Sequence, residues 1–126
     1  MWFIMKTKSE HGKRIIRVLE TDENGDPISR FRTEIYTEKG QPINYVIQLE
    51  VKTKRLLKKE WKPVIRYNYS HEISHRDIYN LKGDKIKENL GFFKDLKHAI
   101  DYGIKDIKSN WEIYIEKFKS DKKWKP

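Results

Sequence analysis

The chain has 126 residues and no cysteine, which suits a single domain over residues 1–126 and excludes disulfides, thiolate zinc sites and a cysteine nucleophile. Its 28 basic and 19 acidic side chains give a net charge of +9, which favours a polyanionic partner over a neutral one; a basic surface that only keeps the protein soluble is the alternative. No apolar stretch has the length of a membrane span, so we expect a cytoplasmic protein without a membrane partner, and the composition is thermophile-like.

Alternating apolar and polar residues predict an antiparallel sheet in the first two thirds of the chain. The alternation is clearest at residues 44–52, where Tyr45, Ile47 and Leu49 would share one face. Asn24-Gly25 is a strong hairpin signal, because both residues tolerate positive φ. We expect about five to six strands, at residues 14–20, 29–37, 44–52, 64–69, 76–81 and 85–88.

The last third of the chain has a helical period. Apolar residues recur at steps of three and four between Leu96 and Phe118, and Asp95 is a suitable N-cap for a helix that would run to about Lys119. The aromatic residues of this stripe, such as Trp111, could stack on bases, but their helical spacing favours the core. The expected fold class is therefore α+β, with the antiparallel sheet packed against one long C-terminal helix.

Residues 64–79 concentrate most of the candidate site chemistry. Two strands joined by a turn at residues 70–74 would bring two histidines within reach of each other. Metal-independent RNA cleavage needs a base, an acid and cations on the phosphate, all of which this hairpin offers, although the same residues could form a hydrogen-bonded structural corner. The candidate catalytic residues are His71, His75, Arg66, Arg76, Asp77 and Tyr67.

The letters His71-Glu72-Ile73-Ser74-His75 also match the zinc-protease pattern H-E-x-x-H. That chemistry requires a helix, whereas the preceding residues 64–69 are mainly β-branched and aromatic and show no helical period. A third ligand is also missing at the usual spacing. These features disfavour a zinc protease, which residues 71–75 in a helix would support, and we expect no metal and no other cofactor.

A second candidate surface is the segment from Lys52 to Lys62, which contains six basic residues and only one acidic residue, Glu60. So focused a charge favours contact with phosphates. Periodicity does not decide whether the segment is a short helical turn or a long connection. The candidate nucleic-acid-binding residues are Lys52, Lys54, Arg55, Lys58, Lys59 and Lys62, with Tyr69 as a base-stacking side chain.

The run Val64-Ile65-Arg66-Tyr67-Asn68, with His71 and then His75-Arg76-Asp77, resembles the RYDnaH…HRH/HRD signature of TumE-like small proteins, some of them toxins of toxin–antitoxin pairs. The residues DIKSNW at 106–111 are similar to the D-I-K-x-N-W segment of uncharacterised relatives. The chain departs from the signature at Asn68, where the family usually has Asp, and at Asp77, where the toxin branch often has His. The resemblance implies a small α+β protein directed at RNA, with an antitoxin protein as partner, or a relative without activity.

Two functions follow from these features. The first is an RNA-directed, toxin-like protein that acts as a metal-independent ribonuclease through the His/Arg cluster on the hairpin. The alternative is a non-catalytic basic protein of the same fold that binds nucleic acid or a protein partner. Neither depends on the oligomeric state, for which a homodimer is one option.

Overall fold

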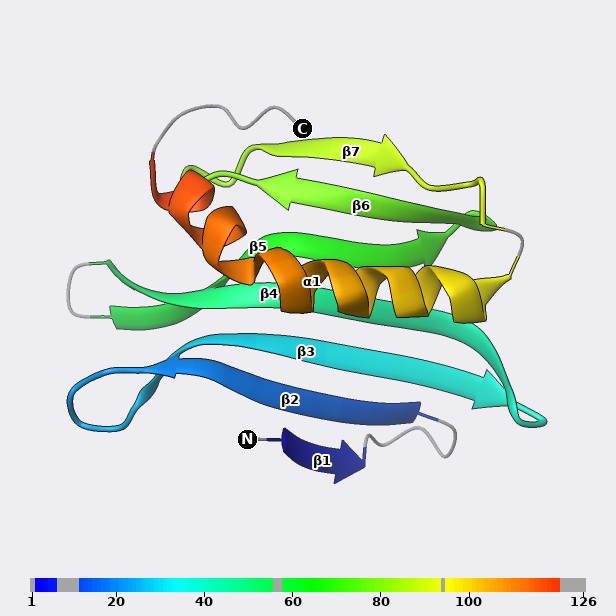
Figure 1. Ribbon diagram of the computed structural model, residues 1–126, viewed down its shortest axis with the longest axis horizontal. Coiled ribbons are helices and arrows are strands. Elements are labelled where there is room, and N and C mark those ends of the chain that lie inside the picture. The colour runs from blue at the N-terminus through cyan, green and yellow to red at the C-terminus, as the bar shows by residue number, and fades with distance from the viewer. Residues whose placement is uncertain (1, 7–11, 56–57, 94, 121–126) are drawn as a thin grey trace.

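Seven strands form one antiparallel sheet in the computed structural model, which describes residues 2–6, 12–55, 58–93 and 95–120 (Figure 1). Each strand pairs with its neighbours in sequence, so the strand order β1-β2-β3-β4-β5-β6-β7 is a meander. The long helix α1 lies across one face of this sheet (Figure 1). The elements are β1 (Trp2–Lys6), β2 (Gly12–Thr21), β3 (Pro27–Glu38), β4 (Gln41–Arg55), β5 (Lys58–Ser70), β6 (Ile73–Tyr79), β7 (Lys85–Asn89) and α1 (Leu96–Lys119).

The predicted α+β architecture of an antiparallel sheet against one long C-terminal helix is confirmed. The six expected strands correspond to β2 to β7, and β1 adds a further strand at the edge of the sheet. Asp95 caps the helix as predicted, because its side chain accepts a hydrogen bond from the backbone N–H of His98 at 2.8 Å. No helix in the described ranges is apolar over enough of its length to cross a membrane.

The predicted helical turn or long connection at residues 52–62 is wrong, because the described part of this segment continues two strands. Strand β4 extends to Arg55 and β5 starts at Lys58, so that the two form one long hairpin. Leu49 pairs with Ile65 but Glu50 pairs with Pro63, which leaves one extra residue in β5. Such a β-bulge is a position where proline, which has no N–H to donate, is tolerated within a strand. Alternation was hard to read here because the bulge reverses its phase.

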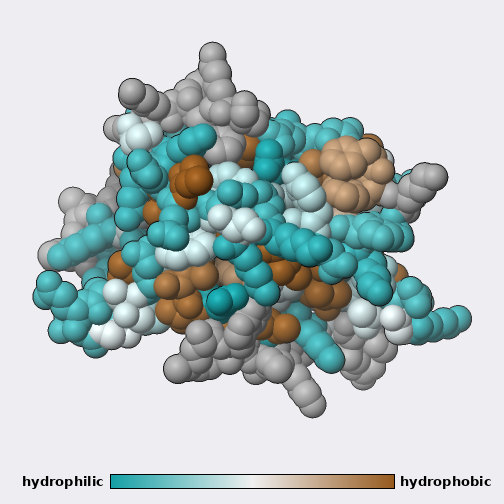
Figure 2. Space-filling view, viewed as in Figure 1, coloured by the Kyte–Doolittle hydropathy of each residue, from teal (hydrophilic) through white to brown (hydrophobic). Residues whose placement is uncertain are grey.

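The hydrophobic core lies between α1 and the central strands. Tyr45, Ile47 and Tyr67 are fully buried there, together with Ile107 of the helix. Trp111 packs against this core from a partly buried position, so it is not a free stacking platform. The helix approaches the sheet closely at Gly103, where a Cβ atom would lie 3.1 Å from both Ile47 Cδ1 and Tyr67 Cγ. The outer surface on the helix side is mainly hydrophilic, with apolar residues between the polar ones (Figure 2).

Candidate functional site

The strand register divides the predicted catalytic residues between the two faces of the sheet. In the strand register Tyr67 lies opposite Arg76, whereas Arg66 lies opposite Asp77 one position further along. Successive side chains of a strand point to opposite faces, so these two pairs lie on opposite sides. Tyr67 is part of the core under α1. Arg66 and Asp77 therefore lie on the side without the helix, which we call the uncovered face.

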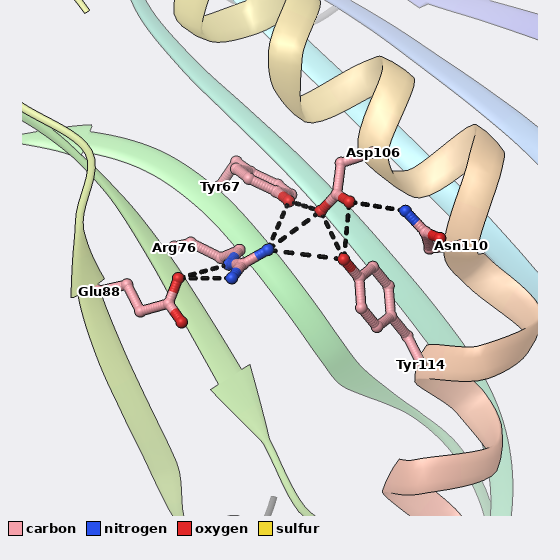
Figure 3. Close-up of polar contacts among 6 residues, drawn as sticks. All are labelled: Tyr67, Arg76, Glu88, Asp106, Asn110 and Tyr114. Atoms are coloured by element: carbon pink, nitrogen blue, oxygen red, sulfur yellow. Dashed lines mark hydrogen bonds and ion pairs between the residues drawn. The ribbon is translucent and has the colours of Figure 1, made fainter. Parts of the chain in front are cut away.

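On the helix side, Asp106 of α1 is the centre of a polar network (Figure 3). Its carboxylate accepts hydrogen bonds from Tyr67, from Tyr114 at 2.7 Å and from Asn110 at 2.9 Å. Arg76 Nη1 approaches the same carboxylate at 3.2 Å. The residues 106–110 of the helix and 67–76 of the hairpin, both part of the stretches that carry the resemblance described above, thus meet in one network.

Arg76 is held from two sides, since its guanidinium also pairs with Glu88 of β7 at 2.5 Å (Figure 3). Only 13% of its side chain and 12% of that of Asp106 are exposed. Burial raises the pKa of Tyr67 and of Tyr114, and the hydrogen bonds to Asp106 raise the pKa of both further. Both phenols therefore stay protonated donors, and the network fastens α1 to β5, β6 and β7.

The two predicted catalytic histidines occupy different settings at the end of this hairpin. His71 and Glu72 form a two-residue turn with φ of 52° and 63°, and Ser70 pairs with Ile73 across it. A two-residue loop with positive φ at both positions is a common hairpin connection. His75 lies in β6 beside Asn68, on the uncovered face. The H-E-x-x-H letters therefore span a turn and a strand, and the helix that a zinc protease would need is absent there.

His75 has one free ring nitrogen. Its side chain is 9% exposed, and Nε2 lies 3.3 Å from the carbonyl oxygen of Ser70. A carbonyl can only accept, so Nε2 carries a proton, and in the neutral imidazole Nδ1 is then the acceptor nitrogen. Nδ1 is buried and has no hydrogen-bond partner among the described residues.

A row of polar side chains crosses the middle of the uncovered face. Arg32 pairs with Gln48, Gln48 with Arg66 and Arg66 with Asp77, on strands β3, β4, β5 and β6 in that order. Adjacent strands lie about 4.8 Å apart, so these four residues span roughly 14 Å across the sheet. We call them the central polar row.

Ion pairs beside this row place the carboxylates deeper than the arginines. Arg14 pairs with Glu34 at 2.5 Å, and Arg30 pairs with Glu50 at 2.7 Å. Between a fifth and a third of each arginine side chain is exposed, against 9% for Glu34 and 5% for Glu50. Arg32 lies 3.6 Å from the second oxygen of Glu50. The uncovered face consequently presents cationic ends to solvent while the balancing negative charge is underneath.

Predicted nucleic-acid-binding lysines lie at one end of the same face. Arg30 stacks over the ring of Trp61 at 3.9 Å, and Lys52 lies 5.4 Å from it on the paired strand. Lys54 and Lys59 pair with each other beyond Lys52, and strand alternation places both on the uncovered face. We call Lys52, Lys54 and Lys59 the basic end.

The other predicted binding residues are not part of this cluster. Lys62 lies 3.8 Å from Glu60 and pairs with the buried Val51, so it points to the helix side, and Lys58 has the same parity. Tyr69 packs against the core near the other end of β5, about 33 Å from Lys59 along the strand. The side chain of Arg55 lies outside the described residues.

Sequence reasoning missed most of the uncovered face. Arg30, Arg32, Gln48 and Trp61 were not candidates, although Arg30 and Arg32 alternate with core residues of β3. That alternation could have flagged a polar face, but the sequence does not show that no helix covers it. Four buried polar atoms without a partner in the described ranges lie on this face: Arg32 Nε, Gln48 Oε1, His75 Nδ1 and Asp77 Oδ1.

Comparison with known proteins places the chain in a family. The model of the family described as Domain of unknown function (DUF7718) matches residues 7–124, nearly the whole chain, so the chain belongs to this family. No curated protein and no solved structure gave a significant match.

Proposed function

We propose that this member of the DUF7718 family binds single-stranded nucleic acid, RNA in the first place, on the uncovered face of its sheet. The observation that carries the proposal is the separation of the two faces. One face is filled by α1 and its polar network, while the other has no helix from the described residues and displays arginines, lysines and an aromatic ring.

Single-stranded nucleic acids are bound by surfaces that combine backbone-tracking cations with aromatic side chains for stacking. The basic end supplies Lys52, Lys54 and Lys59 for phosphates, and Trp61 is a ring to which Arg30 is already stacked. A sheet with helical cover on one side only offers a continuous surface on which several bases can lie. The net charge of +9 fits a polyanionic ligand.

The helix side is a poorer candidate for the same ligand. Arg76 and Tyr67, which the sequence suggested for phosphate and base contacts, are committed to Asp106 and Glu88. Freeing Arg76 for a phosphate would leave two carboxylates without their cation, at a cost of several kcal/mol. This favours a structural role for both residues.

Salt dependence tests the proposal. Binding of a fluorescein-labelled U9 RNA would be measured by anisotropy between 50 and 300 mM salt for the parent and for the Lys52→Gln/Lys54→Gln/Lys59→Gln variant. Each lost phosphate contact flattens the plot of log affinity against log salt by about 0.7, so the triple variant should flatten it by about 2. The matched control carries Lys97→Gln, Lys105→Gln and Lys119→Gln on exposed positions of α1, with the same change of charge.

The control should retain the slope of the parent. Equal slopes in all three proteins would overturn the basic end as the binding site. An equal flattening in the control and in the triple variant would mean that only total charge matters, which is the solubility interpretation.

We carry cleavage of the bound RNA as a second candidate function, favoured by Nδ1 of His75, which lies buried on the side of the uncovered face without a partner among the described residues. His75 would take the proton of a 2′-hydroxyl, whose oxygen attacks the phosphorus, and the leaving 5′-oxygen would take a proton from water or from His71, giving a 2′,3′-cyclic phosphate. Arg66, on the same face, is the cation for the phosphate. A TumE-like toxin role with an antitoxin partner belongs to this candidate.

Gel analysis of RNA incubated at pH 5 to 8 tests cleavage separately from binding. The parent should give 2′,3′-cyclic ends that His75→Gln abolishes while its affinity for RNA is kept. Intact RNA with the parent protein rules out cleavage and leaves the binding function standing.

A further inference from the structure

The end of the β4–β5 hairpin continues past its neighbours in the sheet. The pairing of β3 with β4 ends at Val51, and the pairing of β6 with β5 ends at Ile65. Residues 52–55 and 58–61 go on pairing with each other, and we call this two-stranded ribbon the arm. Going beyond the proposed function, we infer that the arm binds double-stranded DNA by lying in its major groove.

The arm stands clear of the rest of the sheet. No other strand pairs with either of its edges among the described residues. Its four cross-strand pairs give it a length of about 14 Å. In Figure 1 the hairpin extends to the left beyond β6 and beyond the C-terminal end of α1. A ligand can therefore approach the arm from both of its faces.

Lysines lie on both faces of the arm. The basic end is on the uncovered face, whereas Lys58, and Lys62 just beyond the arm, have the opposite parity. Glu60 is the one acidic residue of the arm, and it lies 3.8 Å from Lys62. A single phosphate chain can meet only one face of a ribbon at a time. Cations on both faces fit two phosphate chains with the arm between them.

The dimensions of the arm select the kind of duplex. A β-sheet layer with its side chains is about 10 Å thick, and the major groove of B-form DNA, about 12 Å wide, admits a two-stranded ribbon. The minor groove of B-form DNA is only about 6 Å wide. In A-form RNA the major groove is deep and narrow, so side chains do not enter it. These widths favour duplex DNA over duplex RNA.

The base of the arm is fixed to the sheet, so the arm is ordered before a ligand binds. Trp61 lies opposite Lys52, and Arg30 of β3 stacks over its ring at 3.9 Å. Thr53 Oγ1 donates to the carbonyl oxygen of Glu60 at 3.4 Å across the ribbon. A ribbon that is already ordered loses less conformational entropy when it enters a groove.

Methylation protection tests the inference with the parent protein. Dimethyl sulfate methylates N7 of guanine in the major groove and N3 of adenine in the minor groove, so one reagent reports on both grooves of a DNA duplex of about 20 base pairs. We expect the protein at saturation to protect guanine N7 and to leave adenine N3 reactive. Protection of N3 alone, protection of neither atom, or no binding of the duplex at low salt would overturn the inference.

A variant of the helix side of the arm separates the duplex from the single strand. Each lost phosphate contact flattens the plot of log affinity against log salt by about 0.9 for duplex DNA, so Lys58→Gln/Lys62→Gln should flatten the slope for the duplex by about 1.8. Its slope for U9, which the proposed function places on the uncovered face, should stay that of the parent. The matched control Lys97→Gln/Lys105→Gln, at exposed positions of α1, should keep both slopes.

The RNA duplex of the same sequence completes the comparison. It should bind more weakly than the DNA duplex by about tenfold, because its narrow groove does not admit the arm. Equal affinity for the two duplexes, with equal slopes for the parent and for Lys58→Gln/Lys62→Gln, would overturn the inference and leave single-strand binding standing. Protected guanine N7 in a protein that does not bind U9 would instead overturn the proposed function and support the groove-binding arm.

Discussion

Arg66 and Arg76 lie one cross-strand pair apart on β5 and β6, yet they serve opposite faces of the sheet. Arg76 pairs with Tyr67 and reaches Asp106 of α1 at 3.2 Å. Arg66 lies opposite Asp77 in the strand register, on the uncovered face. One arginine therefore fastens the helix, and the other lies on the face that we propose as the binding surface.

This division predicts very different costs of removing each arginine. Arg76→Ala leaves the partly buried carboxylates of Asp106 and Glu88 without their cation, and because breaking a fully buried pair from one side costs about 3–5 kcal/mol, we expect a loss of up to about 3 kcal/mol of unfolding free energy. The matched variant Arg66→Ala should change it by about 0.5 kcal/mol or less. Urea denaturation of both variants measures the difference, and comparable losses would contradict the assignment of the two faces.

Gly103 predicts a second effect on stability, at the place where α1 lies closest to the sheet. A leucine there has no room beside Ile47 and Tyr67, and overpacking of this kind costs about 1–3 kcal/mol, even though leucine is the better helix former. Ser109→Leu, at an exposed position of the same helix, is the control and should be neutral or slightly stabilising. Thermal denaturation gives both values. A Gly103→Leu protein as stable as the parent would mean that the helix can lift off the sheet without loss.

Stability should fall in alkaline solution because of the phenols under the helix. The pKa values of Tyr67 and Tyr114 are raised in the folded protein, whereas in the unfolded chain they are near 10. Above about pH 10 the unfolded chain releases these protons and the folded protein keeps them, so the unfolding free energy decreases as pH rises. The effect is absent below pH 9.

Urea titrations between pH 8 and 11 measure this slope. Tyr114→Phe should be less stable at neutral pH, because Asp106 loses a donor, but should show a shallower alkaline slope, by up to about 1.4 kcal/mol per pH unit. Tyr45 and Tyr79, whose pKa values burial also raises, account for part of the slope that remains. An identical slope in the parent and in Tyr114→Phe would refute the protonated network.

Trp61 should contribute to binding through stacking. Its replacement by alanine removes the ring that Arg30 contacts and should weaken U9 binding by about 1–3 kcal/mol, with little change in the salt slope because no charge is lost. Phe92, a 68% exposed aromatic residue just after β7, provides the control, and Phe92→Ala should bind like the parent. If Trp61→Ala and Phe92→Ala bind U9 with equal affinity in anisotropy titrations, stacking on Trp61 is excluded.

The sequence predicted the elements that have a local hydrophobic period, but not the faces of side chains, which depend on the register between strands. Alternation at residues 44–52 and the stripe from Leu96 to Phe118 are local signals; the helix formed over the expected residues, and the strand includes the expected ones but runs from Gln41 to Arg55. The faces of Arg66 and Arg76 depend instead on a two-residue turn at His71-Glu72, which fixes the pairing of β5 with β6. A turn one residue longer would have exchanged the faces of all β6 side chains.

The central polar row was beyond sequence reasoning for a related reason. Successive members of the row are separated by between 11 and 18 positions along the chain, and the four residues become neighbours only through three successive strand pairings. The bulge between Leu49 and Glu50 then shifts the phase of β5, which hid Trp61 from the pattern. The proximity of Tyr67 and Arg76 to Asp106 could not be predicted either, because it depends on where α1 lies on the sheet.

The meander order of the strands also bears on how the molecule forms. Because every strand pairs with the one before it, the chain can build the sheet by adding one hairpin at a time, and no pairing has to wait for distant segments to meet. The helix follows all seven described strands in sequence, and its network with Tyr67 and Arg76 can close only after β5 and β6 are paired. During synthesis the surface that α1 will cover is therefore exposed until residues 96–119 emerge, so docking of α1 is the step that completes the core.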